Sequence, residues 1–112
     1  MKNEIFLVPY PFTNANVSKP RPALCLTEPH GDHEEVIFAI VTSQTVNDAQ
    51  LTDVELNPNS DIGRSTRLLR TSTARLHRLF TLNRYRVGRK IGELSPELRT
   101  KVAQKLRLVF DL

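Results

Sequence analysis

Residues 36–42, Val-Ile-Phe-Ala-Ile-Val-Thr, form the strongest strand pattern in this chain of 112 residues. A short, continuous apolar run that is rich in β-branched residues is typical of a strand buried on both faces. Crossing a bilayer as a helix would take about 20 apolar residues, and no run in the sequence approaches that length. The sequence therefore predicts a β-sheet that has this strand in its interior.

Weaker strand patterns lie on both sides of this run, separated by segments rich in proline, glycine and asparagine. We expect further strands at residues 4–10, 22–27, 53–56 and 71–77, and a last strand or strand pair in which residues 79–82 continue into residues 85–91. Residues 13–19 have the composition of a mobile loop, and residues 28–35 that of a connecting turn.

The chain is expected to end in a helix. Ser95 is a good N-cap and Pro96 then falls at the first helical position, after Gly92 has led the chain out of the sheet. Four apolar residues then recur at helical spacing, which predicts that one face of the helix packs on the sheet: Leu98, Val102, Leu106 and Val109. The fold class is therefore mainly β with a C-terminal α-helix.

Length and composition indicate one domain over residues 1–112, with a modest core. The N-terminus lacks the pattern of a signal peptide, so we expect a cytoplasmic protein with no membrane partner. Cys25, the one cysteine, lies within an apolar strand pattern and is expected to be a small buried hydrophobic residue.

The charges of the two halves of the chain are opposite. Residues 1–60 carry three Lys and Arg against eight Asp and Glu, a net −5, whereas residues 61–112 carry thirteen against four, a net +9. This asymmetry fits an anionic partner, with nucleic acid the commonest candidate. Simple solvation of a helix and strands by charged side chains would give the same pattern.

Arg21 stands between two prolines directly before an apolar strand pattern. Pro22 restricts Arg21 to an extended conformation and Pro20 fixes its own φ, so the backbone can hold this guanidinium in one place. An edge strand that begins with prolines and carries a solvated arginine is the alternative.

Three further groups carry polar side chains. Thr42, Ser43 and Gln44 end the buried strand where side chains can project into a groove, although an ordinary strand end would look the same. His77 is the histidine that falls within a predicted strand and could carry protons near neutral pH, or simply face solvent. The histidines and carboxylates of residues 30–35 read as a solvated acidic turn, so no metal site and no cofactor is predicted.

Five motifs, in this order and spacing, resemble the MazF/PemK family of toxin endoribonucleases over nearly the whole chain. They are residues 7–13 (LVPYPFT), 21–24 (RPAL), 41–44 (VTSQ), 75–82 (RLHRLFTL) and 90–96 (KIGELSP). The resemblance implies a small SH3-like β-barrel with a C-terminal helix, of the type shared with CcdB. It also implies a homodimer and a cognate antitoxin that occupies the RNA groove and binds DNA together with the toxin.

The same resemblance implies sequence-specific cleavage of single-stranded RNA without a metal, leaving 2′,3′-cyclic phosphate and 5′-hydroxyl ends. Arg21 matches the family's R-P arginine and Thr42 its hydroxyl after the third strand. Arginine supplies a rigid fork for phosphate, and threonine can hold a non-bridging oxygen. His77 is the weaker candidate for proton transfer. RNA contacts are expected from Lys19, Ser43, Gln44, Arg75 and Arg78.

Two positions depart from the family pattern. The family often has a glycine and an acid before the first strand, where this chain has Asn3 and Glu4, and asparagine tolerates similar backbone angles. The family often has Asp where His77 stands, which bears on how the groove reads RNA.

Two other functions remain open. The first is a non-catalytic toxin that poisons a protein such as gyrase, as CcdB proteins do with an aromatic C-terminal tail, whereas this chain has no tryptophan. The second is a barrel that binds nucleic acid without cutting it.

Overall fold

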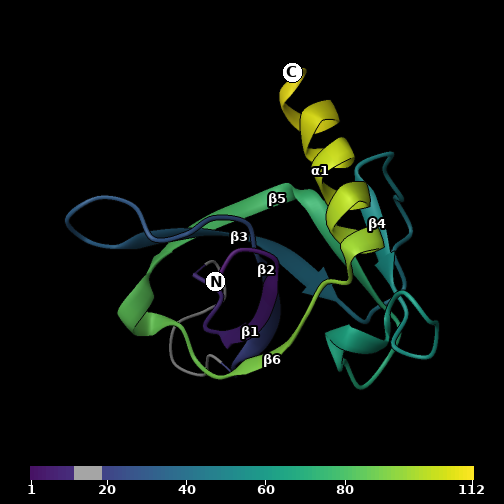
Figure 1. Cartoon of the computed structure of the whole chain (residues 1–112), viewed down its shortest axis with the longest axis horizontal. Coiled ribbons are helices and arrows are strands. Elements are labelled where there is room, and N and C mark those ends of the chain that lie inside the picture. The colour runs from purple at the N-terminus through teal and green to yellow at the C-terminus, as the bar shows by residue number, and fades with distance from the viewer. Residues whose placement is uncertain (12–18) are drawn as a thin grey trace.

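The computed structural model describes residues 1–11 and 19–112, in which a curled sheet carries a C-terminal helix (Figure 1). The elements are β1 (Glu4–Val8), β2 (Arg21–Cys25), β3 (Glu35–Thr42), β4 (Asp53–Leu56), the 3-10 helix η1 (Arg64–Thr66), β5 (Ser72–Asn83), the 3-10 helix η2 (Arg84–Arg86), β6 (Lys90–Glu93) and α1 (Pro96–Phe110).

The six strands form one antiparallel sheet in the order β4-β5-β3-β2-β1-β6. The sheet curls into a half-barrel, and α1 lies beside β4 and β5 with its C-terminal end projecting away from the sheet (Figure 1). This confirms the predicted mainly β fold with a C-terminal helix. Apart from Lys19, the loop predicted at residues 13–19 lies outside the described residues.

β3 is buried on both faces, as its apolar run predicts. Alternate side chains of a strand point to opposite faces. Val36 and Phe38 pack in one core cluster, whereas Ala39 and Val41 pack in a second cluster that includes Leu98 of α1. Both faces of the curled sheet therefore carry a core, and this strand is shared between the two.

β5 is one strand of 12 residues where the sequence predicted two. Its register against β3 shifts between Ala39 and Ile40, whose partners on β5 are Leu79 and Arg75. Residues 76–78 are therefore extra residues in this ladder. A bulge of this kind bends a strand and increases its twist, so β5 can follow the curl of the sheet and pair with both β3 and β4.

The predicted continuation of a strand through residues 85–91 holds only for Lys90 and Ile91, which begin β6. The Asn83 side chain accepts a hydrogen bond of 2.8 Å from the Tyr85 amide, which begins η2 instead of a strand. Gly92, expected to lead out of the sheet, lies inside β6. A Cβ at Gly92 would be 2.2 Å from the carbonyl oxygen of Thr66 in η1, so a glycine is needed for this close approach.

α1 begins and packs as its sequence predicts. Ser95 is the N-cap, and its Oγ accepts a hydrogen bond of 3.3 Å from the Leu98 amide. Leu98 and Val102 are buried, and Leu106 and Val109 pack against the same core cluster with partial burial. No helix within residues 1–11 and 19–112 is long and apolar enough to cross a membrane.

The first strand is approached through Asn3, which adopts a φ of 70°. This lies in the left-handed region, which asparagine tolerates better than most residues, so the expectation for Asn3 is confirmed. Its amide donates to the carbonyl of Cys25 at 2.9 Å, and its carbonyl accepts from the Leu94 amide at 2.9 Å. Cys25 itself is fully buried, as its apolar neighbours predict.

Candidate functional site

A cavity of about 560 Å³ lies where β2 begins and β3 ends. Six of the residues proposed from the sequence line it: Arg21, Thr42, Ser43, Gln44, Arg75 and Arg78. They come from three strands and the β3–β4 loop, so the curl of the sheet brings them together. The other two proposed residues, Lys19 and His77, are not among the residues that line this cavity.

Arg21 and Thr42 reach the cavity from neighbouring strands. β2 and β3 are antiparallel with Ala23 opposite Ile40, so continuing this register by two residues brings Arg21 to the level of Thr42. Arg21 is exposed, and no carboxylate within residues 1–11 and 19–112 forms an ion pair with it. A guanidinium without a protein counterion is available to an anionic ligand.

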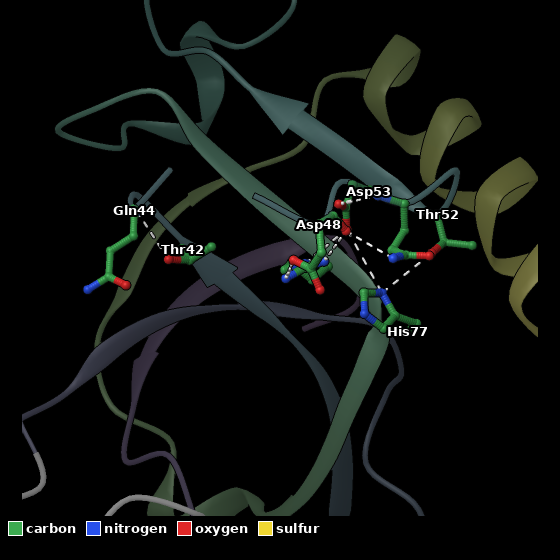
Figure 2. Close-up of polar contacts among 8 residues, drawn as sticks. Thr42, Gln44, Asp48, Thr52, Asp53 and His77 are labelled. Atoms are coloured by element: carbon green, nitrogen blue, oxygen red, sulfur yellow. Dashed lines mark hydrogen bonds and ion pairs between the residues drawn. The ribbon is translucent and has the colours of Figure 1, made fainter. Parts of the chain in front are cut away.

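Thr42 begins a tight turn at the end of β3. The Gln44 amide donates a hydrogen bond of 3.1 Å to Thr42 Oγ1 (Figure 2). This bond uses the oxygen of the hydroxyl as acceptor and leaves its proton to donate to a ligand. Hydroxyls commonly stabilise turns in this way, which explains the polar residues at this strand end.

Arg75 lines the cavity, but its guanidinium is already occupied by two carboxylates. Its side chain is 8% exposed. Arg75 Nε donates to Asp53 Oδ1 at 3.2 Å, and its Nη1 donates to Asp48 Oδ1 at 3.1 Å. Its Nη2 also donates to the backbone carbonyl of Asp48 at 3.2 Å. Arg75 therefore ties β5 to the segment between β3 and β4, at Asp48 near the middle of that segment and at Asp53 directly after it.

This segment, residues 43–52, is the β3–β4 loop, and its first part forms one wall of the cavity. Asp53 also holds the far end of the loop, because its Oδ2 accepts a hydrogen bond of 2.9 Å from the Gln50 amide. The loop is thus fixed by charge-assisted bonds, which are stronger than neutral ones. The shape of the cavity therefore depends on Arg75 as well as on the strands.

The cavity contains one carboxylate among its described lining residues, that of Asp48. The hydrogen bond from Arg75 holds the pKa of this carboxyl below its usual value, and the charge of Arg78 acts in the same direction. Arg21 and Arg78 have no ion-pair partner in the described part of the chain, so the cavity keeps an excess of positive charge.

His77 lies on β5, and its imidazole points toward Thr52 and Asp53, where β4 starts (Figure 2). Its Nδ1 is 3.4 Å from Thr52 Oγ1 and 3.9 Å from Asp53 Oδ1. Arg75 and His77 thus share Asp53. Lys19 is exposed and stands two residues before Arg21.

Sequence reasoning missed Tyr10 and Asp48, which both line the cavity. The sequence does draw attention to Tyr10, which stands between Pro9 and Pro11 in one of the five family motifs, but it does not indicate a role for the side chain. Nothing in the sequence distinguishes Asp48, because a single aspartate in a polar loop is ordinary. Among the described residues, no group of three or more His, Cys, Asp or Glu side chains is arranged to hold a metal ion.

Comparison with known proteins identifies the family. Residues 1–110 match the family model of PemK-like, MazF-like toxins of type II toxin-antitoxin systems. A comparison with curated proteins found no match.

Solved structures show the same fold. The structure of the Mycobacterium tuberculosis toxin MazF-mt6 has a TM-score of 0.73 with 23% identity, covering 97% of both chains. An endoribonuclease in complex with its cognate antitoxin, from a mycobacterial species, has a TM-score of 0.71 with 16% identity, covering 100% of this chain and 95% of the other. MazF from Deinococcus radiodurans has a TM-score of 0.68 with 16% identity, covering 99% and 96%. From the family model and this shared fold, the chain belongs to the PemK-like, MazF-like toxin family of type II toxin-antitoxin systems.

Proposed function

We propose that this toxin is a sequence-specific endoribonuclease that cleaves single-stranded RNA by attack of the 2′-hydroxyl on the adjacent phosphate, without a metal ion. The observation that carries the proposal is the cavity in which Arg21 and Thr42 meet beside Arg78. Family membership supports it, as does the description of a similar structure as an endoribonuclease.

The main requirement of this reaction is stabilisation of the negative charge that develops on the phosphate, which cationic and hydrogen-bonding side chains can provide without a metal ion. The 2′-oxygen forms a bond to phosphorus while the bond to the 5′-oxygen breaks, so negative charge grows on the non-bridging oxygens. Arg21 would bind two of the phosphate oxygens with its planar fork, and the Thr42 proton would bond a non-bridging oxygen and hold the phosphate in line. The products are a 2′,3′-cyclic phosphate and a 5′-hydroxyl.

Two protons move in this reaction, one from the 2′-hydroxyl and one to the 5′-oxygen. The sequence suggested His77 for proton transfer, but its imidazole contacts Thr52 and Asp53 outside the lining of the cavity, so its part in moving these protons would be small. Asp48 suits proton abstraction poorly, because its lowered pKa makes it a weak base.

RNA binding is proposed to extend beyond the reacting phosphate. Ser43, Gln44 and Arg78 line the cavity and would contact the nucleotides on either side of it. Arg75 would affect RNA binding indirectly, by fixing the β3–β4 loop that forms one wall of the cavity. Lys19 would bind the RNA backbone outside the cavity.

We also propose that the toxin acts in the cytoplasm as a homodimer and is neutralised by a cognate antitoxin. A mycobacterial endoribonuclease of the same fold is described in complex with its cognate antitoxin, which supports an antitoxin for this chain. Large apolar side chains exposed at the end of α1 offer surface for an interface: Leu108, Phe110 and Leu112. Light scattering of the purified toxin, alone and with its antitoxin, would measure both assemblies.

The function is tested with purified protein, a defined single-stranded RNA and excess EDTA. We expect cleavage that persists in EDTA and leaves cyclic phosphate at one new end and a hydroxyl at the other. An all-deoxy strand of the same sequence is the matched control, because it lacks the attacking 2′-hydroxyl and should stay intact. Cleavage that EDTA abolishes and magnesium restores would contradict the proposed mechanism, and RNA that binds without being cut would contradict the activity.

A further inference from the structure

The hydroxyl of Tyr10 joins β2 to β3 immediately beside the cavity. It donates a hydrogen bond to the carbonyl of Pro22 and accepts one of 3.1 Å from the Val41 amide. The Val41 carbonyl is also within reach, at 3.2 Å. Pro22 directly follows Arg21, and Val41 directly precedes Thr42.

This bridge stands where the ladder between the two strands ends. The pairing includes Leu24 with Ala39 and Ala23 with Ile40, and the next pair in that register would be Pro22 with Val41. Proline has no amide hydrogen, so this pair cannot form the two backbone hydrogen bonds of an ordinary antiparallel rung. The hydroxyl of Tyr10 lies between the two strands and takes the place of these missing backbone hydrogen bonds.

The ring of Tyr10 is fixed by the core behind it. Tyr10 is 8% exposed, and its ring centroid is 5.2 Å from that of Phe80, which stacks on Phe38 at 5.7 Å. An aromatic side chain held in this way places its hydroxyl with little remaining freedom. Burial raises the pKa of Tyr10, so the hydroxyl stays protonated and can donate at neutral pH.

We propose that Tyr10 is a positioning residue for RNA cleavage, which sets the separation of the two strand ends that carry Arg21 and Thr42. The inference rests on the proposed function. A phosphate in the cavity must meet the Arg21 guanidinium and the Thr42 hydroxyl together, and displacement of catalytic groups by about 1 Å can cost about 100-fold in rate. A hydroxyl that bridges the residues next to both of them controls that geometry without touching RNA.

The test is Tyr10→Phe, which keeps the ring packing and removes the bridge. We expect single-turnover cleavage at saturating protein to slow by at least about 10-fold, because only the alignment of the reacting groups is lost. Affinity for the all-deoxy strand should stay nearly unchanged, since the cations of the cavity remain. Hydrogen exchange at the Val41 amide should accelerate, which reports the loss of the bridge directly.

Tyr85→Phe is the matched control. The Tyr85 hydroxyl also has a partner, Glu34 Oε2 at 2.5 Å, but Tyr85 is 79% exposed and lies outside the lining of the cavity. This variant should cleave at the wild-type rate. All rates are compared at a temperature at which every protein is fully folded by circular dichroism, so that a loss of stability does not count as a loss of alignment.

Each outcome decides a different point. Slow cleavage by Tyr10→Phe with normal affinity and fast Val41 exchange supports the inference. If wild-type protein cleaves RNA and Tyr10→Phe cleaves it at the same rate, the inference is overturned, whatever happens to Val41 exchange. The proposed function is unaffected by that result. A parallel loss of affinity and rate would make Tyr10 a binding residue and overturn the positioning role. Wild-type protein that cuts no RNA overturns the proposed function, and the inference with it.

Discussion

Asp48 and Arg75, 27 residues apart, join the loop after β3 to β5 through an ion pair of 3.1 Å between Oδ1 and Nη1. The same guanidinium bonds Asp53, the first residue of β4 after the loop. One arginine thus determines how a polar loop with little regular structure forms a wall of the cavity.

The two carboxylates held by Arg75 should differ in their effect on stability, because they differ in exposure. The Asp53 side chain is 9% exposed, whereas that of Asp48 is 65% exposed. Arg75→Ala leaves the buried Asp53 charge unpaired, and we expect it to lower the free energy of unfolding by about 3 kcal/mol. Asp48→Asn should lower it only slightly, since an exposed pair contributes little. Urea denaturation measures both losses, and because Arg75→Ala removes both pairs, equal losses would show that the Asp53 pair adds nothing to stability.

Arg21 should affect the rate of cleavage far more than RNA binding. If it stabilises charge that develops only during attack, Arg21→Ala should slow single-turnover cleavage by about 100-fold or more. Arg21→Lys should not restore the full rate, because an ammonium cannot reproduce the planar fork. Arg64→Ala is the control, since the 76% exposed Arg64 side chain pairs with Asp61 outside the cavity. A folded Arg21→Ala protein that cuts at the normal rate would exclude Arg21 from the mechanism.

RNA affinity should fall as salt rises, because cations of the basic half of the chain displace counterions from the phosphates. For single strands the slope of log K against log salt is about −0.7 for each phosphate contact. Removing Arg78, which lines the cavity without an ion pair in the described part of the chain, should make that slope shallower by about 0.7. Titrations of the all-deoxy strand at several salt concentrations measure this, and an unchanged slope would mean that Arg78 only solvates the surface.

His77 should have a small effect on cleavage, because its imidazole faces Thr52 and Asp53 and does not line the cavity. We expect His77→Asn to cleave RNA at close to the wild-type rate between pH 5 and 8. A general acid or base contributes about 100-fold to 10,000-fold, so a loss of that size would instead establish the proton-transfer role proposed from the sequence. The loss of one ionisation from the pH-rate profile would support the same conclusion.

Cys25 should make the stability of the toxin depend on alkaline pH. Burial raises the pKa of its thiol from 9.0 to about 11. A group whose pKa is raised by folding contributes fully below the unfolded pKa, and that contribution is lost as pH rises through the folded pKa. We therefore expect part of the stability to disappear between pH 9 and about 11. Cys25→Ala should reduce that dependence when urea midpoints are compared across the range, and identical pH curves would contradict it.

Local physics in the sequence determined the elements that it predicted well. The run of residues that forms β3 is apolar on both faces, so it must be buried on both faces. Ser95 caps α1 through a hydrogen bond to a residue only three positions away, Leu98. The asparagine at position 3 tolerates its positive φ because of its own side chain. The motifs also predicted that Arg21 precedes one strand and that Thr42 ends another, and the structure pairs these two strands so that both residues line one cavity.

Tertiary structure decided whatever depends on partners distant in the chain. Gly92 belongs to β6 because it pairs with Ile5 of β1, and it must be a glycine because its backbone approaches Thr66; its neighbours in sequence reveal neither contact. Arg75 holds a loop because folding buries it between Asp48 and Asp53, so its charge alone indicated RNA binding. Tyr10 bridges the strand ends because Pro22 leaves a gap that only the curl of the sheet brings within reach of its hydroxyl. The spacing of residues along the chain determines which side chains share a face of a strand or helix and which residues cap a helix. Which side chains meet across the cavity depends instead on how the strands pack.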